Sequence, residues 1–146
     1  MSAETVKSQF EGASDDNFWR ARPSLAAPGV SRLGGRGLFA LTAIEAGAVI
    51  EKACTVEILE EQAKPLDAVR PIGDFYFAHP ENPKAGLMAY GLMSFCNHAQ
   101  DANADMRWSR HEKLGWIAEL VAVKSIREGD EITYRYKCPL WFSDNR

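Results

Sequence analysis

The sequence predicts a mainly β protein with short helical pieces, and two observations support this fold class. Short runs rich in Val, Ile, Phe and Tyr recur along the chain, and these residue types favour strands. Gly, Pro, Asp and Glu separate the runs at short intervals, as expected of turns between strands. The pattern shows neither an internal repeat nor a low-complexity segment, so we expect one compact arrangement of strands.

The composition is that of one globular domain. A chain of 146 residues, with 46% hydrophobic and 25% charged residues, buries roughly two thirds of its unfolded surface on folding. The formal net charge of −3 argues against direct nucleic-acid binding, because such domains are usually clearly basic. No stretch approaches the ~20 apolar residues of a membrane span, so no membrane partner is expected. The three cysteines, Cys54, Cys96 and Cys138, are far apart, which favours a reducing compartment.

The N-terminal segment is polar and carries no apolar run typical of a signal peptide. The expected location is therefore cytoplasmic, although nuclear or exported targeting also fits. Phe18 and Trp19 stand out, and two adjacent aromatics favour partial order over a flexible tail. Pro28-Gly29 marks the entry to the compact part. We divide the chain into a polar leader over 1–27, a domain over 28–142 and a tail over 143–146.

The first half of the domain predicts strands joined by turns. Strands are expected over four short runs: 37–40, 48–51, 54–59 and 75–77. A turn at 45–47 separates the first two, and another spans 80–83. Residues 60–70 are polar and broken by Pro65, so we expect a loop with one helical turn there.

The second half predicts one helix and three more strands. Residues 85–95 carry apolar side chains at a spacing that suits a short amphipathic helix. A hairpin over 110–115 and a tight turn over 127–130 follow. The expected strands cover 105–108, 116–123 and 131–136.

Three short segments carry candidate chemistry. The first, 34–37, is Gly-Gly-Arg-Gly, and glycines permit positive φ and a close approach of backbone to ligand. A dinucleotide fingerprint and a phosphate loop are both excluded, since neither G-x-G-x-x-G nor Gly-Lys-Ser/Thr is present. The second is Asn97-His98, and the third runs from Gly129 to Tyr136. Taken alone, these segments are usually a turn, a satisfied polar pair and a packing strand.

Together, the order and spacing of the three segments resemble the SET domain of protein-lysine methyltransferases. Asn97, His98 and Asn103 fall at the positions of the family's Asn-His-Ser-Cys-x-Pro-Asn. Residues 126–136 follow the family's Ile-x-x-Gly-Glu-Glu-Leu-Thr-x-x-Tyr, and residues 35–51 agree upstream. The departures are Ser94, Ala99, Gln100 and Ala102, which replace Arg, Ser, Cys and Pro.

The resemblance covers residues 28–142 and looks most like the minimal, stand-alone SET proteins of bacteria and large viruses. It implies the β-clip fold of small curved sheets with a pseudoknot and short helices. In this fold the C-terminal strand lies beneath the Asn-His loop. Cys138 alone cannot build the zinc site of the flanking modules in many eukaryotic relatives, so no metal is expected. Small viral relatives suggest a homodimer, which nothing in the sequence demands.

The resemblance also implies a binding site for S-adenosylmethionine (AdoMet) on one face of the domain. The implied contacts are the backbones of Gly35, Arg36 and Gly37, the Asn97 side chain, the His98 main chain, Tyr136, and Trp141 stacked on adenine. The substrate lysine would enter from the opposite face, through a channel lined by Phe75, Tyr76 and Tyr134.

The implied reaction is methyl transfer to a neutral lysine amine of a histone-like or other basic protein. An unperturbed pKa of ~10.4 leaves about one lysine in 2,500 neutral at pH 7. The cofactor's positive charge and an apolar channel both favour the neutral amine, so no general base is required. Tyr136 would orient the amine and, with Tyr134, form the catalytic pair. Tyr134 restricts the channel, which favours mono- or dimethylation.

Two other interpretations are weighed against this one. A catalytically weak SET-like module that binds a protein tail or the cofactor fits the replacements Ser94, Ala99 and Ala102. A β-rich nucleic-acid binder is disfavoured by the charge and by the lack of a basic-aromatic stripe. Glu51 has no implied role and is interpreted as a solvated charge at the end of a strand.

Overall fold

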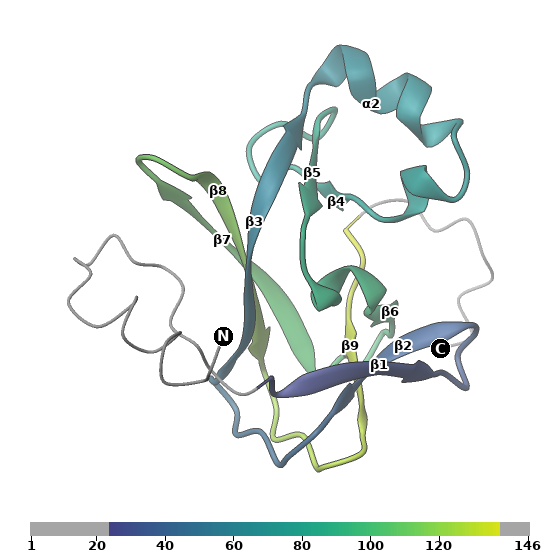
Figure 1. The fold of residues 1–146 in the computed structure, drawn as a ribbon, viewed down its shortest axis with the longest axis vertical. Coiled ribbons are helices and arrows are strands. Elements are labelled where there is room, and N and C mark those ends of the chain that lie inside the picture. The colour runs from purple at the N-terminus through teal and green to yellow at the C-terminus, as the bar shows by residue number, and fades with distance from the viewer. Residues whose placement is uncertain (1–23, 138–146) are drawn as a thin grey trace, which may run out of the picture.

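The computed structural model describes residues 24–137. Most of the polar leader and the C-terminal residues, Cys138 and Trp141 among them, lie outside this range, and the division into leader, domain and tail stays a prediction. Among the described residues, no helix is long and apolar enough to cross a membrane. The described residues form a β-rich body (Figure 1).

Nine strands form one open mixed sheet, which confirms the mainly β fold class. The strand order is β1-β2-β9-β7-β8-β3-β5-β4, with β6 paired to β9 beside this path. The bounds are β1 Ala26–Val30, β2 Arg36–Ala40, β3 Val49–Ile58, β4 Phe77–Ala78, β5 Gly86–Ala89, β6 Asn97–His98, β7 Ala104–His111, β8 Gly115–Ala122 and β9 Glu131–Tyr134. The helical pieces are α2 Glu60–Asp67, η1 Ile72–Asp74 and η2 Leu92–Phe95.

Strand β8 is central because its sequence is apolar on both faces. It pairs with β7 on one side and with β3 on the other, and five successive residues from Trp116 to Leu120 are buried. A strand that is buried on both faces is expected to be a nearly continuous apolar run. The predicted β7–β8 hairpin is confirmed, and it closes at Gly115, whose φ of +74° favours glycine.

Two predicted strands prove to be one. The runs 48–51 and 54–59 form the single ten-residue strand β3. This strand changes partner along its length, pairing with β8 through Cys54 and with β5 from Thr55 onward. An irregularity between Val49 and Glu51 shifts the register, and a bulge of this kind bends a strand. The change of partner between Cys54 and Thr55 lets β3 join the two parts of the sheet.

The predicted helix over 85–95 is wrong. Its first part is strand β5, which pairs with both β3 and β4, and its second part is the 3-10 turn η2. The spacing of apolar residues suits either structure, and the free edge of β3 decides in favour of a strand. Gly86 fits this arrangement, because a Cβ there would lie 2.3 Å from the Tyr76 ring.

The region 60–70 contains a full helix instead of a loop with one turn. Helix α2 spans eight residues with Pro65 inside it. Glu60 and Glu61 lie in its first turn, where carboxylates favour the helix dipole. The Gln62 side chain also accepts the Leu59 N–H at 3.0 Å. These N-terminal interactions offset the hydrogen bond that Pro65 cannot donate.

Smaller differences concern the element ends. Pro28 and Gly29 lie inside β1, where a Cβ on Gly29 would come within 2.8 Å of the Phe39 ring. Of the predicted strand 75–77, only Phe77 belongs to a strand, because η1 ends just before Phe75. Strand β9 ends at Tyr134, so Tyr136 lies beyond it.

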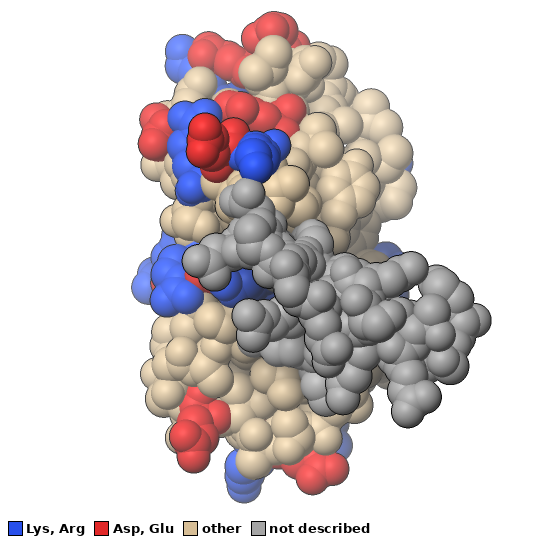
Figure 2. All heavy atoms as spheres, turned by 60° about the vertical axis from the view of Figure 1, so that its left-hand side comes forward, with Lys and Arg blue, Asp and Glu red and all other residues tan. Residues whose placement is uncertain are grey.

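The buried Glu119 carboxylate on β8 pairs across the sheet with the half-buried Lys52 on β3 and the exposed Arg107 on β7. Lys52 on β3 approaches it at 2.8 Å, and the Arg107 Nε on β7 donates to it at 2.6 Å. Burial would raise the pKa of Glu119, but the hydrogen bonds and charges of Lys52 and Arg107 outweigh this and hold the pKa below its usual value. Figure 2, which turns this side of the molecule forward, shows basic and acidic side chains interspersed on the surface.

We predict that Glu119→Gln lowers the free energy of unfolding by about 1–3 kcal/mol at pH 7, because two cations lose their charged acceptor. Since the folded-state pKa is depressed, this stabilisation is present above the unfolded value of about 4.3 and is lost as the pH falls through the folded value. Urea unfolding at pH 7 and pH 3 measures the effect. The exposed Glu128→Gln is the control, and a Glu119 effect of equal size at both pH values would contradict the prediction.

Candidate active site

Parallel pairing of β6 with β9 brings two of the three segments together. Asn97 lies opposite Thr133, and His98 lies opposite Tyr134. The ring of His98 is buried, and its Nδ1 accepts the backbone N–H of Tyr136 at 3.0 Å. The structure thus places the Asn-His pair directly beside the predicted catalytic tyrosines.

Asn103 fastens the end of the Asn-His segment to β9. Its Nδ2 donates to the Glu131 carbonyl at 2.8 Å, and its Oδ1 accepts the Thr133 N–H at 2.9 Å. Both groups of the amide are therefore used on one strand. This accounts physically for an asparagine at the last matched position of the motif.

The remaining segment, the glycine turn over 34–37, contacts the Asn-His pair and β9 through Asn97. The Asn97 Nδ2 donates to the Arg36 carbonyl at 2.7 Å and to the Glu131 Oε1 at 2.9 Å. Gly35 has a φ of +59°, and no described atom lies within 4 Å of the position that a Cβ would take there. A Cβ on Gly37, by contrast, would come within 2.2 Å of the Glu131 Oε1. The turn is open at Gly35 and closely packed at Gly37.

The methionine part of AdoMet is the group that the resemblance implies at this cluster. The exposed backbone at Gly35 offers close approach without a side chain in the way, and the Asn97 amide and Glu131 carboxylate supply polar groups beside it. Gly35, Arg36, Gly37, Asn97 and His98 are therefore brought together as the sequence predicts. Their roles toward the cofactor stay predictions, and Trp141 lies outside the described residues.

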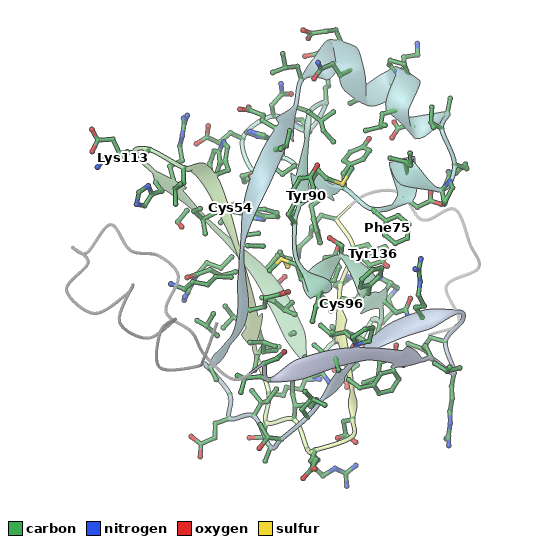
Figure 3. All side chains as sticks on the ribbon, in the orientation of Figure 1. Cys54, Phe75, Tyr90, Cys96, Lys113 and Tyr136 are labelled. Atoms are coloured by element: carbon green, nitrogen blue, oxygen red, sulfur yellow. The ribbon has the colours of Figure 1, made fainter. Side chains whose placement is uncertain are left out.

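Tyr136 is held by its hydroxyl group. The hydroxyl donates to the Cys96 carbonyl at 2.9 Å, and the Tyr136 ring lies 4.9 Å from the Tyr134 ring and 5.3 Å from the His98 ring. Figure 3 shows Tyr136, Cys96 and Phe75 near one another, between η2 and the end of β9. Tyr136 is therefore held at both its backbone N–H and its hydroxyl group.

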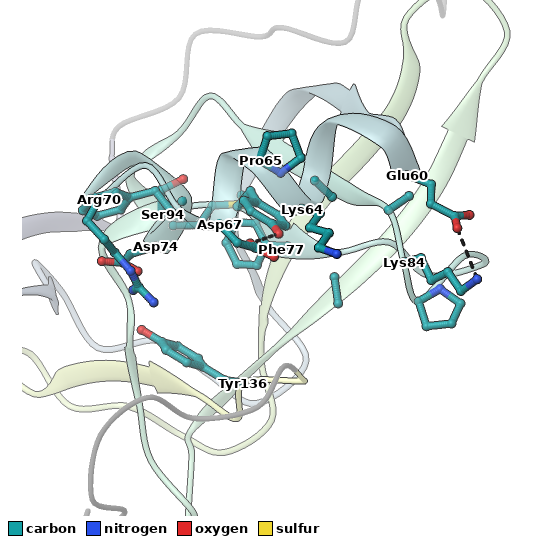
Figure 4. Close-up of a pocket in the computed structure, with 18 of the residues that line it drawn as sticks. Glu60, Lys64, Pro65, Asp67, Arg70, Asp74, Phe77, Lys84, Ser94 and Tyr136 are labelled. Carbon is teal, nitrogen blue, oxygen red and sulfur yellow. Dashed lines mark hydrogen bonds and ion pairs between the residues drawn. The ribbon is translucent and has the colours of Figure 1, made fainter.

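A pocket of about 1160 Å³ opens on the side of Tyr136 that faces α2 (Figure 4). Its lining includes all four residues predicted for the chemistry and the lysine channel, namely Phe75, Tyr76, Tyr134 and Tyr136. These four residues form the aromatic wall of the pocket. Helix α2, η1, the middle of η2 and the loop over 83–85 form the other walls. The Tyr76 hydroxyl donates to the Asp67 carboxylate on α2, so the aromatic wall contacts the helix.

Arg36 connects the glycine turn to the aromatic wall. Its guanidinium carbon lies 4.8 Å from the Phe95 ring centroid and 5.6 Å from that of Phe75. The two rings pack edge to face at 6.1 Å. Such cation–π contacts stabilise by about 0.5–1 kcal/mol each at exposed sites. The side chain of Arg36 therefore spans from the turn to the pocket.

Glu51 has a structural task that sequence reasoning missed. Its carboxylate accepts the N–H groups of Leu92 at 2.8 Å and Met93 at 2.7 Å, so the interpretation as a solvated charge is wrong. These N–H groups begin η2 and have no partner within the turn itself. Gly91 leaves room for this carboxylate, since a Cβ there would lie 3.0 Å from the Glu51 Oε1.

Cys96 contributes its backbone and not its thiol. The side chain is buried, and burial, followed by the negative charges of Glu51 and Glu131, raises the pKa of the thiol far above its ordinary value. A thiol that stays protonated is not a nucleophile. In the described part of the chain, no three His, Cys, Asp or Glu residues gather as a metal site would require.

Comparisons with known proteins agree with this geometry. The model of the SET domain family matches residues 35–137. The histone-lysine N-methyltransferase SET9 of Phaeosphaeria nodorum is 37% identical over 90 residues, which are 62% of this chain and 12% of that protein. The chain thus spans about one eighth of the length of this relative.

Solved structures share the fold. A candidate histone methyltransferase of Plasmodium falciparum aligns with a TM-score of 0.65 and 25% identity, over 83% of this chain and 100% of that one. The Chaetomium thermophilum Polycomb Repressive Complex 2, in an autoinhibited conformation bound to S-adenosylmethionine, aligns with a TM-score of 0.65 and 23% identity. That alignment covers 80% of this chain and 15% of the other, and it shows likeness of fold.

We predict that Glu51→Ala lowers the free energy of unfolding by about 1–3 kcal/mol, because two N–H groups at the start of η2 lose a charged acceptor. Glu51→Gln should lose less, since one amide oxygen can still accept one of them. Chemical denaturation of the two variants against wild type measures the order. The exposed Glu45→Ala is a matched control, and equal losses at positions 45 and 51 would refute the assigned role.

Proposed function

Because the chain belongs to the SET domain family, we propose that it transfers a methyl group from AdoMet to a lysine side chain of a protein. The observation that carries this proposal is the fixed Tyr136 hydroxyl, which donates to the Cys96 carbonyl at 2.9 Å while lining a pocket with Tyr134. Family membership is supported by the match over 35–137. Tyr136 is also the residue that the motif assigns to the chemistry.

The chain's own residues would act by positioning. When bound, AdoMet supplies a methyl group on a positively charged sulfur atom. Because the Tyr136 hydroxyl already donates its hydrogen to Cys96, its oxygen is left to accept a hydrogen bond from the lysine amine. Tyr134 is 8% exposed and packs against Phe77 at 5.6 Å and Tyr136 at 4.9 Å. Such an apolar aromatic wall favours the neutral amine over the ammonium.

We further infer that the substrate is a histone-like or other basic protein. The name of the Phaeosphaeria nodorum relative, a histone-lysine N-methyltransferase, supports this class. The pocket lining carries acidic side chains (Glu60, Glu61, Asp67 and Asp74) and basic ones (Lys64, Arg70 and Lys84) in nearly equal number, and Lys84 pairs with Glu60. The inference of a basic substrate therefore rests on the relative and not on the charge of the pocket.

The first test combines transfer with binding. Purified protein is incubated with radiolabelled AdoMet and a panel of lysine-rich proteins, and calorimetry measures the dissociation constant for AdoMet. Label on protein lysine supports the enzyme. Binding without transfer to any member of the panel would favour the catalytically weak module, and lack of AdoMet binding would overturn the proposal.

We predict that Tyr136→Phe reduces kcat by roughly 10²–10³-fold, because it removes the group that orients the amine. AdoMet binding should change little. The free energy of unfolding should fall by about 1 kcal/mol, because the hydrogen bond to Cys96 is lost. Transfer rates, calorimetry and denaturation separate the three effects. Tyr90→Phe, at a tyrosine that is 70% exposed, is the control. Near-normal transfer by Tyr136→Phe would reject the catalytic assignment.

We predict mainly mono- or dimethylated product from the wild type, because the Tyr134 hydroxyl takes up space in the channel. Tyr134→Phe removes this oxygen and should shift the product toward a higher methylation state. Mass spectrometry of a peptide substrate at matched turnover numbers measures the distribution. Dominant trimethylation by the wild type, or an unchanged distribution in the variant, would contradict the prediction.

A further inference from the structure

We propose that Glu131 is a positioning residue, which fixes the Asn97 amide so that its oxygen accepts the α-ammonium group of the cofactor. The inference rests on the proposed function, since it concerns how AdoMet is bound. It assigns a role to a carboxylate that the sequence motifs leave without one. The proposal is carried by hydrogen bonds among Glu131, Asn97, Arg36 and Ser31.

The first observation is that Asn97 has used both of its amide hydrogens. They are donated to the Arg36 carbonyl at 2.7 Å and to the Glu131 Oε1 at 2.9 Å. A primary amide has two donor hydrogens and one acceptor oxygen. With both hydrogens engaged by the protein, the only group that Asn97 can offer a ligand is its oxygen. A ligand at this position must therefore present a donor.

The second observation is that the flipped amide is disfavoured by the same two partners. A 180° flip would set the Asn97 oxygen against the Arg36 carbonyl and the Glu131 carboxylate. All three are acceptors, and the carboxylate is charged, so the flipped state loses two hydrogen bonds and gains repulsion. Glu131 thus selects one of two rotamers that would otherwise be close in energy.

The third observation is that the Glu131 carboxylate is itself held in place. The Ser31 hydroxyl lies 2.8 Å from each of its oxygens. Gly37 leaves room for the carboxylate, since a Cβ there would overlap it at 2.2 Å. The backbone of Glu131 is fixed as well, because its carbonyl accepts the Asn103 Nδ2 at 2.8 Å. These contacts make the side chain a fixed reference for the Asn97 amide.

The ligand chemistry follows from these contacts. A donor that also carries positive charge gains both from the Asn97 oxygen and from the nearby Glu131 carboxylate. The α-ammonium of an amino-acid side arm meets both conditions. A nucleoside that lacks this group gains from neither, so the contribution of Glu131 should depend on the amino group of the ligand.

The test compares three ligands by calorimetry: AdoMet, S-adenosylhomocysteine and 5′-methylthioadenosine, which lacks the amino-acid arm. We expect Glu131→Gln to weaken the first two by about 10- to 100-fold, the range for hydrogen bonding to a charged group. Binding of 5′-methylthioadenosine should change less than about twofold. Glu128→Gln removes the same charge from an exposed position three residues away and should leave all three affinities unchanged.

The outcomes separate a positioning role from a merely structural one. Equal weakening of all three ligands, or no change for any of them, would overturn the inference and leave the proposed function intact. A wild type that binds neither AdoMet nor S-adenosylhomocysteine would overturn the proposed function and this inference together. Should Glu131→Gln fail to fold, Ser31→Ala releases the carboxylate while keeping its charge. It should then weaken AdoMet and S-adenosylhomocysteine binding selectively, by a smaller factor.

Discussion

The pairing of β6 with β9 is the constraint on which the candidate site depends. Only two residues of β6 take part, and a parallel pair this short is weak without further support. Asn103 supplies that support, because both its amide nitrogen and its amide oxygen form hydrogen bonds with the β9 backbone. His98 and Tyr136 extend the attachment beyond the strand ends. Without this junction, the Asn-His pair and the tyrosines would belong to separate parts of the chain.

Carboxylates organise the loops around this junction. Glu51 holds the start of η2, and η2 in turn presents the Cys96 carbonyl to Tyr136. Glu131 holds the glycine turn and Asn97 together. In both cases a partly buried charge takes up backbone or amide hydrogens that would otherwise need water. Charge-assisted hydrogen bonds thus fix these loops together with the apolar packing of Met93 and Cys96 in the core.

Sequence reasoning succeeds where local chemistry decides and fails where distant partners decide. The β7–β8 hairpin could be predicted, because its turn and the two strand-forming runs beside it are local in the sequence. Motif order selected the candidate site residues, and the fold brings the described ones together, while their roles stay predictions. The pattern over 85–95 could not separate helix from strand, since the answer lay in the edge offered by β3. Likewise, the partners of Glu51 lie 41 and 42 residues away, beyond any periodicity.

Arg36 belongs to two environments at once. Its carbonyl accepts the Asn97 amide, while its guanidinium covers Phe95 and Phe75 at the rim of the pocket. A molecule resting on the glycine turn and a molecule entering the pocket would therefore bear on the same residue from opposite ends. If binding of one molecule changes the affinity for the other through Arg36, thermodynamic linkage requires the reverse effect to have the same factor. One arginine would then couple binding at the glycine turn to binding in the pocket.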